Sequence, residues 1–379
     1  IYFKFINEIF GMEKGNQVLI KQAKLMASNP SERTICARLM NDRFALCLPR
    51  EEFDEKRVAD SIKELQREFS GNSFHLHTYM GVYEIRDRDE AVSIMVDKAN
   101  IAADTIKNNY DCCVAYYDEH LLEISIEQRR LLGEFEPALQ NDEFVMYLQP
   151  QVKRDGAAKG AEALVRWVHP SRGILTPYAF IDILENAGLI YKLDLYIWEK
   201  AAQKLAEWKE KGYGSYHISV NISTKDFYII DIYETFTGLI NKYGIAASNL
   251  HLEITETTLM TDFEKNMNII HKLQDVGFRV EIDDFGSGYS SLNMLKDISA
   301  DVLKIDMGFL RKSENEVKGQ DILESIITLA GKIGMDVITE GVETKKQLDM
   351  LTMMGCHEFQ GYYFSKPVPV SEFEEKYLV

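Results

Sequence analysis

The chain has few cysteines, and none has a spacing typical of a disulfide framework or a zinc site. Its five cysteines are an odd number, and no pair has the CxxC spacing. Disulfide-rich domains pair an even set of cysteines, and structural zinc sites use closely spaced pairs. The sequence therefore argues against both and favours a reducing compartment, which is the cytoplasm.

Positive charge and long apolar runs are also lacking. The net charge is −17, which argues against binding a nucleic acid polymer, because phosphate contacts need clustered Lys and Arg. No apolar run is long enough to span a bilayer, and we find no signal peptide. The chain begins at Ile1 and reads as a fragment, so an upstream sensor or membrane anchor is compatible with it.

The composition is that of a soluble globular protein. The chain has 379 residues, of which 46% are hydrophobic and 27% charged, and this length favours two or three domains. We expect a boundary after residue 122. Residues 1–122 alternate between helix and strand patterns, and residues 123–379 have the length of one (β/α)8 barrel.

The front part is predicted to be an α/β domain. Amphipathic patterns predict helices over 16–26, 51–69 and 89–108, and strands over 34–39, 44–48, 74–83 and 113–117. The polar turn Met40-Asn41-Asp42-Arg43 joins the first two strands.

The back part alternates short β-rich runs with amphipathic segments. Strands are predicted over 144–149, 160–166, 217–221, 251–254, 279–283, 302–305, 336–338 and 359–363. Helices are predicted between them, for example over 196–208, 262–276 and 322–333. Gly212, Gly277 and Gly334 are typical of helix ends that lead into the next strand. This alternation indicates a barrel.

Polar side chains follow strand after strand in this part. They are Glu162, Asn221, Glu253, the pair Asp283-Asp284, Lys304 and Glu340. One acidic strand end is an ordinary solvated turn. In a barrel, however, the carboxyl ends of the strands converge on the face where active sites lie. We therefore expect these side chains to form one site.

Such a site would gather five carboxylates. Two of them about 4 Å apart repel by roughly 4 kcal/mol at an effective dielectric constant near 20, so the cluster needs cations. Two divalent ions and Lys304 would bring it close to neutrality. An oxygen-only ligand set favours Mg²⁺ or Mn²⁺ over Zn²⁺, and two such ions suit hydrolysis of a phosphodiester. Asp283 is the natural bridging ligand, and Arg166 is suited to pair with a phosphate.

The back part resembles an EAL domain, the family of cyclic di-GMP phosphodiesterases. The matching stretches are Gln149-Pro150, Glu162-Ala163-Leu164-Val165-Arg166-Trp167, His169-Pro170, Val220-Asn221-Ile222-Ser223, Leu252-Glu253-Ile254-Thr255-Glu256, Asp283-Asp284-Phe285-Gly286-Ser287-Gly288, Leu303-Lys304-Ile305-Asp306, Glu340-Gly341-Val342-Glu343 and Gln360-Gly361-Tyr362-Tyr363-Phe364-Ser365-Lys366-Pro367. The resemblance implies a TIM-like (β/α)8 barrel that hydrolyses cyclic di-GMP to linear pGpG.

The resemblance also implies a role for each matching residue. One metal would be held by Glu162, Asn221, Glu253 and Asp283, and a second by Asp283, Asp284 and Glu340. Lys304 would orient the attacking water, and the catalytic set would be Lys304, Glu340, Glu162 and Asp283. The substrate-binding site would be lined by Gln149, Leu164, Arg166, Glu343 and Gln360. Glu256 would anchor the loop 285–295, which in the family couples the metal site to homodimer contacts. The family also implies inhibition by Ca²⁺.

The front part resembles a GGDEF domain, the ferredoxin-like α/β fold of diguanylate cyclases. The resemblance lies in Phe3-Lys4-Phe5-Ile6-Asn7-Glu8 and in the stretch 38–46. The family has two glycines and then two carboxylates where this chain has Met40-Asn41-Asp42-Arg43. This departure implies an inactive cyclase with a regulatory or structural role. Binding of GTP without turnover stays open.

Two other function classes compete with the hydrolase. The first is a non-catalytic cyclic di-GMP receptor, which would be expected to lack metal ligands, whereas all of them are present. The second is a barrel lyase that uses Lys304 as a Schiff-base amine. That chemistry needs a lowered lysine pKa, and neighbouring carboxylates raise it.

Overall fold

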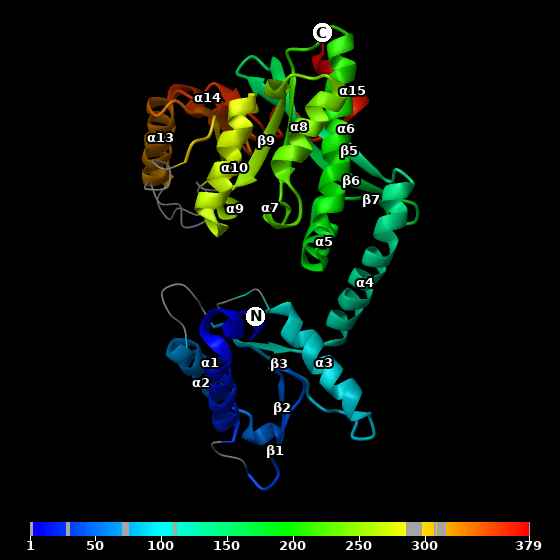
Figure 1. The fold of residues 1–379 in the computed structure, drawn as a ribbon, viewed down its shortest axis with the longest axis vertical. Helices are drawn as coiled ribbons and strands as arrows, with labels where there is room; N and C mark the ends of the chain where they lie inside the picture. Colours follow the sequence, from blue (N-terminus) through cyan, green and yellow to red (C-terminus); the bar gives the residue numbers. More distant parts are fainter. Residues whose placement is uncertain are drawn as a thin grey trace. The chain divides into compact units, whose positions relative to one another are not determined.

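The computed structural model describes residues 3–27, 31–69, 76–107, 109, 112–285, 298–306, 308 and 316–378. These residues fall into two compact units, Ile1–Arg130 and Leu131–Val379 (Figure 1). The helix α4 (Glu119–Gln140) continues from the first unit into the second. The boundary that we predict after residue 122 lies within this helix and stays a prediction.

The first unit contains two small sheets and three long helices among the described residues. One sheet is the antiparallel pair β1 (Ile35–Arg38) and β2 (Phe44–Cys47), and the other is the parallel pair β3 (Met80–Val82) and β4 (Val114–Tyr116). The helices are α1 (Phe3–Met26), α2 (Glu55–Phe69) and α3 (Val92–Thr105), with a short 3₁₀ helix η1 (Arg50–Glu52). The predicted α/β pattern is confirmed. The four described strands form two separate pairs rather than one ferredoxin-like sheet.

The turn between β1 and β2 keeps its hairpin shape without glycine. Leu39 N donates to Arg43 O at 2.8 Å, and Arg43 N donates to Met40 O at 3.2 Å. Asn41 has a φ of 60°, and asparagine tolerates this left-handed conformation better than most residues. The Met40 side chain is 80% exposed. The hairpin turn therefore forms with Met40 and Asn41 in place of the two glycines of the GGDEF pattern, and it carries a bulky exposed side chain.

The second unit is a closed barrel. Eight strands of its described residues form a ring, in the order β5 (Phe144–Lys153), β6 (Ala158–His169), β8 (His217–Ile222), β9 (Leu250–Thr255), β10 (Val280–Phe285), β11 (Val302–Asp306), β12 (Asp336–Glu340) and β13 (Glu358–Phe359). The first seven overlap predicted strands along most of their length, whereas β13 shares only Phe359 with the strand predicted over 359–363. The short strands β7 (Gly173–Leu175) and β14 (Val368–Pro369) add to β6 and β5.

The barrel departs from a regular (β/α)8 barrel at its first strand. β5 runs antiparallel to both neighbours, β6 and β13, whereas the other neighbouring strands of the ring are parallel. The reason is local, because the turn Arg154–Ala157 joins β5 directly to β6 as a hairpin with no helix between them. Antiparallel strands need only a short turn, whereas parallel strands need a long crossover.

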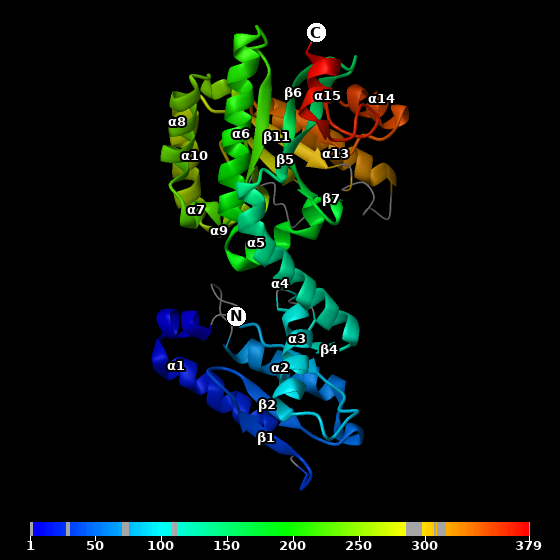
Figure 2. The same cartoon turned by 90° about the vertical axis from the view of Figure 1, so that its right-hand side faces the viewer.

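Helices cover the outside of the barrel (Figure 2). The connections contain α5 (Ile181–Ala187), α6 (Ile190–Glu210), α7 (Asp226–Ile229), α8 (Ile232–Tyr243), α9 (Glu256–Thr261), α10 (Phe263–Val276), α13 (Glu316–Lys332) and α14 (Lys345–Met353), with the 3₁₀ helices η2 (Pro177–Ala179) and η3 (Ala247–Asn249), and α15 (Val370–Tyr377) follows the last strand. Gly277 ends α10 with a φ of 105°. It turns the chain into β10, as predicted.

The barrel strands are buried on both faces. Apolar side chains such as Ile218, Leu252 and Leu303 belong to the large core that includes Trp198 and Phe236 of the covering helices. The residues that alternate with them point into the barrel and are largely polar. The polar side chains therefore line the interior of the barrel, and the apolar side chains that stabilise it pack between the strands and the covering helices.

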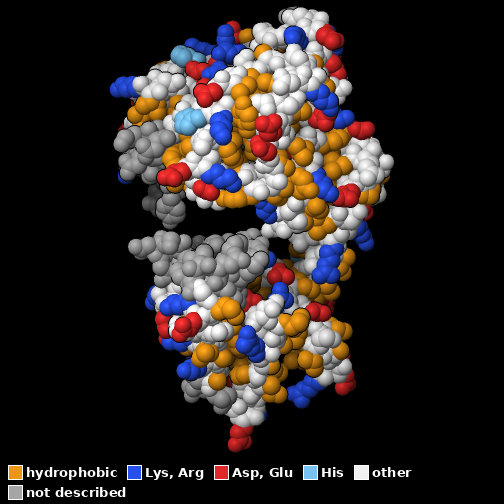
Figure 3. Space-filling view, viewed as in Figure 1, with side chains coloured by type: hydrophobic (Ala, Val, Ile, Leu, Met, Phe, Trp, Pro, Cys, Tyr) orange, Lys and Arg blue, Asp and Glu red, His pale blue; other side chains and the backbone are white. Residues whose placement is uncertain are grey.

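On the face of the second unit that Figure 3 shows, acidic and basic side chains are interspersed. The net negative charge is therefore not concentrated in one patch of that face. None of the described helices has the length and apolar character needed to cross a membrane.

Candidate active site

Four carboxylates surround the ammonium of Lys304 inside the barrel. Lys304 Nζ lies 2.7 Å from Glu340 Oε1, 2.9 Å from Glu253 Oε1, 3.3 Å from Asp283 Oδ1 and 3.5 Å from Glu162 Oε2. These residues come from β6, β9, β10, β11 and β12. The sequence prediction that they converge is confirmed by these contacts.

The strand pattern explains why Lys304 points inward. Its neighbours Leu303 and Ile305 are buried in the apolar core, and successive side chains of a strand point to opposite faces. Lys304 therefore projects into the barrel, where its side chain is 1% exposed. A lysine buried this deeply needs compensating negative charge, which the carboxylates supply.

Amide side chains complete the lining. Asn221 Nδ2 donates to Glu162 Oε1 at 3.2 Å, and Gln360 Nε2 donates to Glu162 Oε2 at 2.5 Å. Gln360 also donates to Gln149 Oε1 at 3.3 Å. The indole of Trp198 donates to the carbonyl of Asn221 at 2.9 Å, so the helix α6 holds the end of β8 in place.

Burial and like charge shift the pKa values in this cluster. Burial alone lowers the pKa of Lys304, but the four carboxylates outweigh it and raise that pKa well above its usual value. Burial raises the pKa of Glu340 to about 8, although Lys304 opposes the shift. Burial and the charge of Glu162 raise the pKa of Glu253 well above its usual range. One ammonium is therefore not enough to neutralise the site.

The donor set fits hard divalent cations. The charged ligands are all carboxylates, and the amides add neutral oxygens, as Mg²⁺ and Mn²⁺ prefer. Glu253 is 0% exposed, and its Oε2 has no hydrogen-bond partner among the described residues. Gln360 Oε1 is likewise buried without one. Buried oxygens are normally satisfied, so these two point to a missing cationic partner.

Other predicted site residues are exposed or half-buried. Asp284 is exposed as a residue and has a φ of 55°. Partial desolvation of its carboxyl group by the surrounding protein, followed by the charges of Asp283 and Asp306, raises its pKa. Glu343 is exposed, and Glu256, the first residue of α9, is half-buried. The predicted loop 285–295 lies outside the described residues after Phe285.

The arginine predicted to meet a phosphate is held at the rim. The Arg166 guanidinium lies over the ring of Tyr147, 5.4 Å from its centroid, and donates to the Val165 carbonyl at 2.8 Å. Leu164, two residues earlier on β6, is half-buried and pairs with Tyr147 across the hairpin. The sequence analysis did not include Tyr147 in the site. Its position opposite Leu164 follows only from the antiparallel register of β5 and β6.

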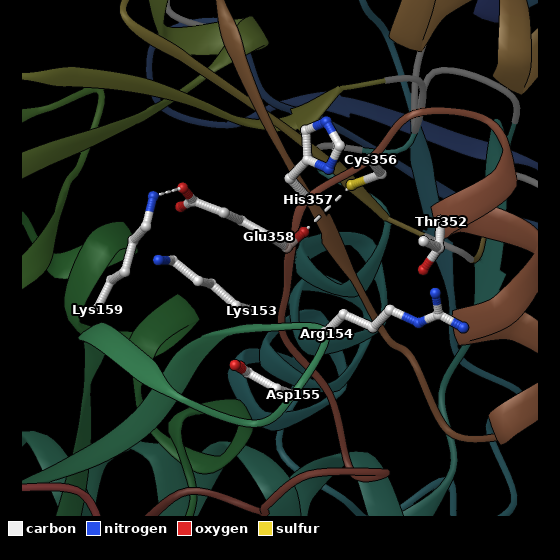
Figure 4. Close-up of a pocket in the computed structure, with 8 residues that line it drawn as sticks. All are labelled: Lys153, Arg154, Asp155, Lys159, Thr352, Cys356, His357 and Glu358. Carbon is white, nitrogen blue, oxygen red and sulfur yellow. Dashed lines mark hydrogen bonds and ion pairs between the residues drawn. The ribbon is translucent and has the colours of Figure 1, made fainter.

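A separate cavity lies at the opposite end of the barrel. It has a volume of about 500 Å³ and is lined by Lys153, Arg154, Asp155, Lys159, Thr352, Cys356, His357 and Glu358 (Figure 4). Lys159 pairs with Glu358, and Arg154 pairs with Asp349 at 3.1 Å. Because Lys159 and Arg154 are already paired and none of the predicted site residues lines the cavity, we assign it no catalytic role.

Two protein family models match this chain. The EAL domain family model matches residues 133–367, and the model described as "Diguanylate cyclase, GGDEF domain" matches residues 1–111. The chain therefore belongs to the EAL domain family and carries an N-terminal GGDEF domain.

Individual relatives match nearly the whole of this chain and are longer than it. The bifunctional diguanylate cyclase/cyclic di-GMP phosphodiesterase MucR of Pseudomonas aeruginosa is 30% identical over 98% of this chain and 55% of its own length. The cyclic di-GMP phosphodiesterase NbdA of the same organism is 28% identical over 99% of this chain and 48% of its own length. The chain spans about half the length of the curated relatives it matches.

Solved structures also resemble part of this chain. The PaMucR phosphodiesterase in complex with c-di-GMP is 33% identical, with a TM-score of 0.61, over 64% of this chain and 99% of that chain. An EAL domain protein from Listeria monocytogenes EGD-e is 30% identical, with a TM-score of 0.55, over 65% of this chain and 97% of that chain.

Proposed function

We propose that this chain is a metal-dependent phosphodiesterase that hydrolyses cyclic di-GMP to linear pGpG. The observation that carries the proposal is the buried ring of Glu162, Glu253, Asp283 and Glu340 around Lys304. A receptor without turnover has no need for buried charges of this kind, which are costly to maintain. Relatives named as cyclic di-GMP phosphodiesterases support the choice of substrate.

The ligand roles that we propose are those implied by the resemblance to EAL domains. Glu162, Asn221, Glu253 and Asp283 would hold one divalent ion, and Asp283, Asp284 and Glu340 a second. Bound Mg²⁺ or Mn²⁺ would polarise the phosphoryl group and make a water molecule more acidic. Gln360 and Gln149 keep the Glu162 carboxylate oriented through their hydrogen bonds.

Lys304 would act by charge and position. Its ammonium stays protonated because the carboxylates raise its pKa, so it has no free electron pair for Schiff-base chemistry. A fixed cation can orient a water molecule for attack and stabilise negative charge on the phosphoryl oxygens. Arg166, Leu164 and Glu343 would contact the nucleotide at the rim.

The GGDEF domain would have a regulatory or structural role. Met40 and Arg43 replace a glycine and a carboxylate of the family pattern at the turn, so we propose that it makes no cyclic di-GMP. We also propose that the chain forms homodimers through its EAL domain, and that the protein acts in the cytoplasm.

The deciding experiment is incubation of the purified chain with cyclic di-GMP and Mg²⁺ or Mn²⁺, followed by chromatographic identification of the product. We expect linear pGpG. Tight binding of intact cyclic di-GMP with no pGpG would contradict the hydrolase and favour the receptor.

A further inference from the structure

A second set of polar side chains lies inside the barrel, one layer below the candidate active site. We call Gln151, His217, Ser219, His251 and Glu281 the floor cluster. Four of them lie two residues from an active-site residue on the same strand, toward the amino-terminal ends of the parallel strands: Gln151 from Gln149, Ser219 from Asn221, His251 from Glu253 and Glu281 from Asp283. His217 lies two residues before Ser219 on β8. Residues two apart in a strand share a face, so the cluster occupies the barrel interior.

The members of the floor cluster contact one another closely. The rings of His217 and His251 stack with centroids 3.8 Å apart and planes 3° from parallel. His251 Nδ1 donates to Glu281 Oε1 at 2.5 Å, and Ser219 Oγ donates to the same oxygen at 3.2 Å. His217 Nε2 donates to Gln151 Oε1 at 2.7 Å. The two imidazoles and the carboxylate therefore form one unit.

This unit is buried and carries an unsatisfied atom. Glu281 is 0% exposed, His251 4% and His217 9%. Glu281 Oε2 is buried and has no hydrogen-bond partner among the described residues. Such a carboxylate is costly unless a cation compensates it.

The backbone leaves space for the imidazole of His217. A Cβ atom at Gly160 would lie 2.4 Å from the His217 ring, which is closer than any real contact. Only glycine at this position of β6 admits the ring. The barrel floor is therefore shaped around a histidine rather than filled by an apolar side chain.

We propose that His217, His251 and Glu281 bind one borderline divalent transition-metal ion of the Zn²⁺ class in the floor of the barrel. Two imidazole nitrogens and one carboxylate oxygen are a ligand set for such ions, and one ligand atom of each residue lies within 4.8 Å of the others. Ser219 and Gln151 offer further oxygens. Nitrogen and oxygen ligands stand about 2.0–2.2 Å from Zn²⁺, so the two rings turn out of their parallel stack when the ion binds.

This site differs in chemistry from the candidate active site. The active site offers oxygen ligands that favour Mg²⁺ or Mn²⁺, whereas the floor cluster offers two nitrogens. The proposal does not depend on the phosphodiesterase function, because the floor site would fill even if the chain had no activity.

The test is a titration of the metal-stripped chain with Co²⁺ and with Zn²⁺ in excess Mg²⁺, which keeps the active site supplied with its own class of ion. We expect about one Co²⁺ per chain, with visible d–d bands typical of nitrogen and oxygen ligands and no thiolate charge-transfer band. The missing thiolate band separates this site from the free cysteines. Zn²⁺ should displace the Co²⁺ and raise the melting temperature.

Glu281→Gln keeps the size of the side chain but removes its charge, and we expect it to weaken Co²⁺ binding by roughly 100-fold or more. His271→Gln is the matched control, because His271 is exposed on α10, and it should bind as the parent chain does. Circular dichroism reports whether each variant is folded. The parent chain tests the proposal without any variant. If it takes up no Co²⁺ in excess Mg²⁺, or if folded Glu281→Gln binds Co²⁺ unchanged, the cluster is only a hydrogen-bonded network and the proposal is wrong.

Discussion

Lys304 Nζ lies 2.7 Å from Glu340 Oε1, inside a barrel where the Lys304 side chain is 1% exposed. The same ammonium reaches three more carboxylates. A single buried ammonium thus compensates only part of the negative charge of the four carboxylates. Divalent cations would compensate the rest, and the predictions below follow from this requirement.

The first prediction concerns metal dependence. Exhaustive chelation should abolish pGpG formation, and Mg²⁺ or Mn²⁺ should restore it, because the carboxylates need cations to bind an anionic substrate. Ca²⁺ should inhibit, since its larger radius and looser coordination suit in-line displacement poorly. Chromatographic product analysis measures each case. Product that still forms after chelation would contradict the two-metal proposal.

The second prediction concerns two metal ligands. Glu162→Ala and Asp283→Ala should each lower kcat by roughly 100-fold or more, while the far-ultraviolet circular dichroism stays that of the parent chain. These side chains lie in the polar interior, and the apolar core on the other strand face is untouched. Asp275→Ala, which removes an exposed carboxylate on α10, is the control and should retain full activity.

The third prediction concerns Lys304. Lys304→Met should lower kcat by orders of magnitude with a smaller change in substrate binding, because a fixed cation contributes most in the transition state. In the presence of a chelator, Lys304→Met should also lower the free energy of unfolding by about 3–5 kcal/mol, because the substitution leaves buried carboxylates unpaired. Added Mg²⁺ should restore part of that loss. Kinetics and denaturant unfolding measure the two effects. Near-normal kcat, or borohydride trapping of a substrate adduct on Lys304, would refute the role.

The fourth prediction concerns pH. The pKa of Glu340 is about 8 in the folded chain, against 4.5 as its ordinary value. Between these values the folded state binds more protons than the unfolded state, so stability falls as pH rises. The metal-free chain should therefore melt at a lower temperature near pH 8 than near pH 5. Saturating Mg²⁺ should flatten this dependence, because cations replace the proton.

Glu340→Gln provides the control for the pH prediction. It keeps the shape of the side chain but cannot titrate, so its metal-free melting temperature should depend less on pH across the same window. A slope identical to that of the parent chain would assign the effect to other groups.

The fifth prediction concerns the front domain. The chain should form no cyclic di-GMP from GTP in the presence of Mg²⁺, because Met40 and Arg43 stand where the family has a glycine and a carboxylate. A barrel variant such as Glu162→Ala should be used, so that any product is not hydrolysed as it forms. Accumulation of cyclic di-GMP would refute the prediction, and calorimetry would show whether GTP binds without turnover.

Much of the barrel could be predicted because its strands carry a local pattern. The positions of all eight strands follow from short β-rich runs, and Lys304 points inward because Leu303 and Ile305 on either side are apolar. The antiparallel direction of β5 could not be predicted in the same way. It depends on the hairpin with β6, which also places Tyr147 opposite Leu164 and beneath Arg166.

The sequence by itself determined which residue types stand at the strand ends, since alternation and spacing are local properties of the chain. Only the tertiary structure decided which of them meet. Closure of the barrel brings Glu162 and Glu340, which are far apart in the sequence, to the same ammonium, while Asp284 and Glu343 stay exposed. The floor cluster shows the same division. His217, His251 and Glu281 each look like ordinary strand residues, and they become a candidate metal site because three parallel strands place them in one buried layer.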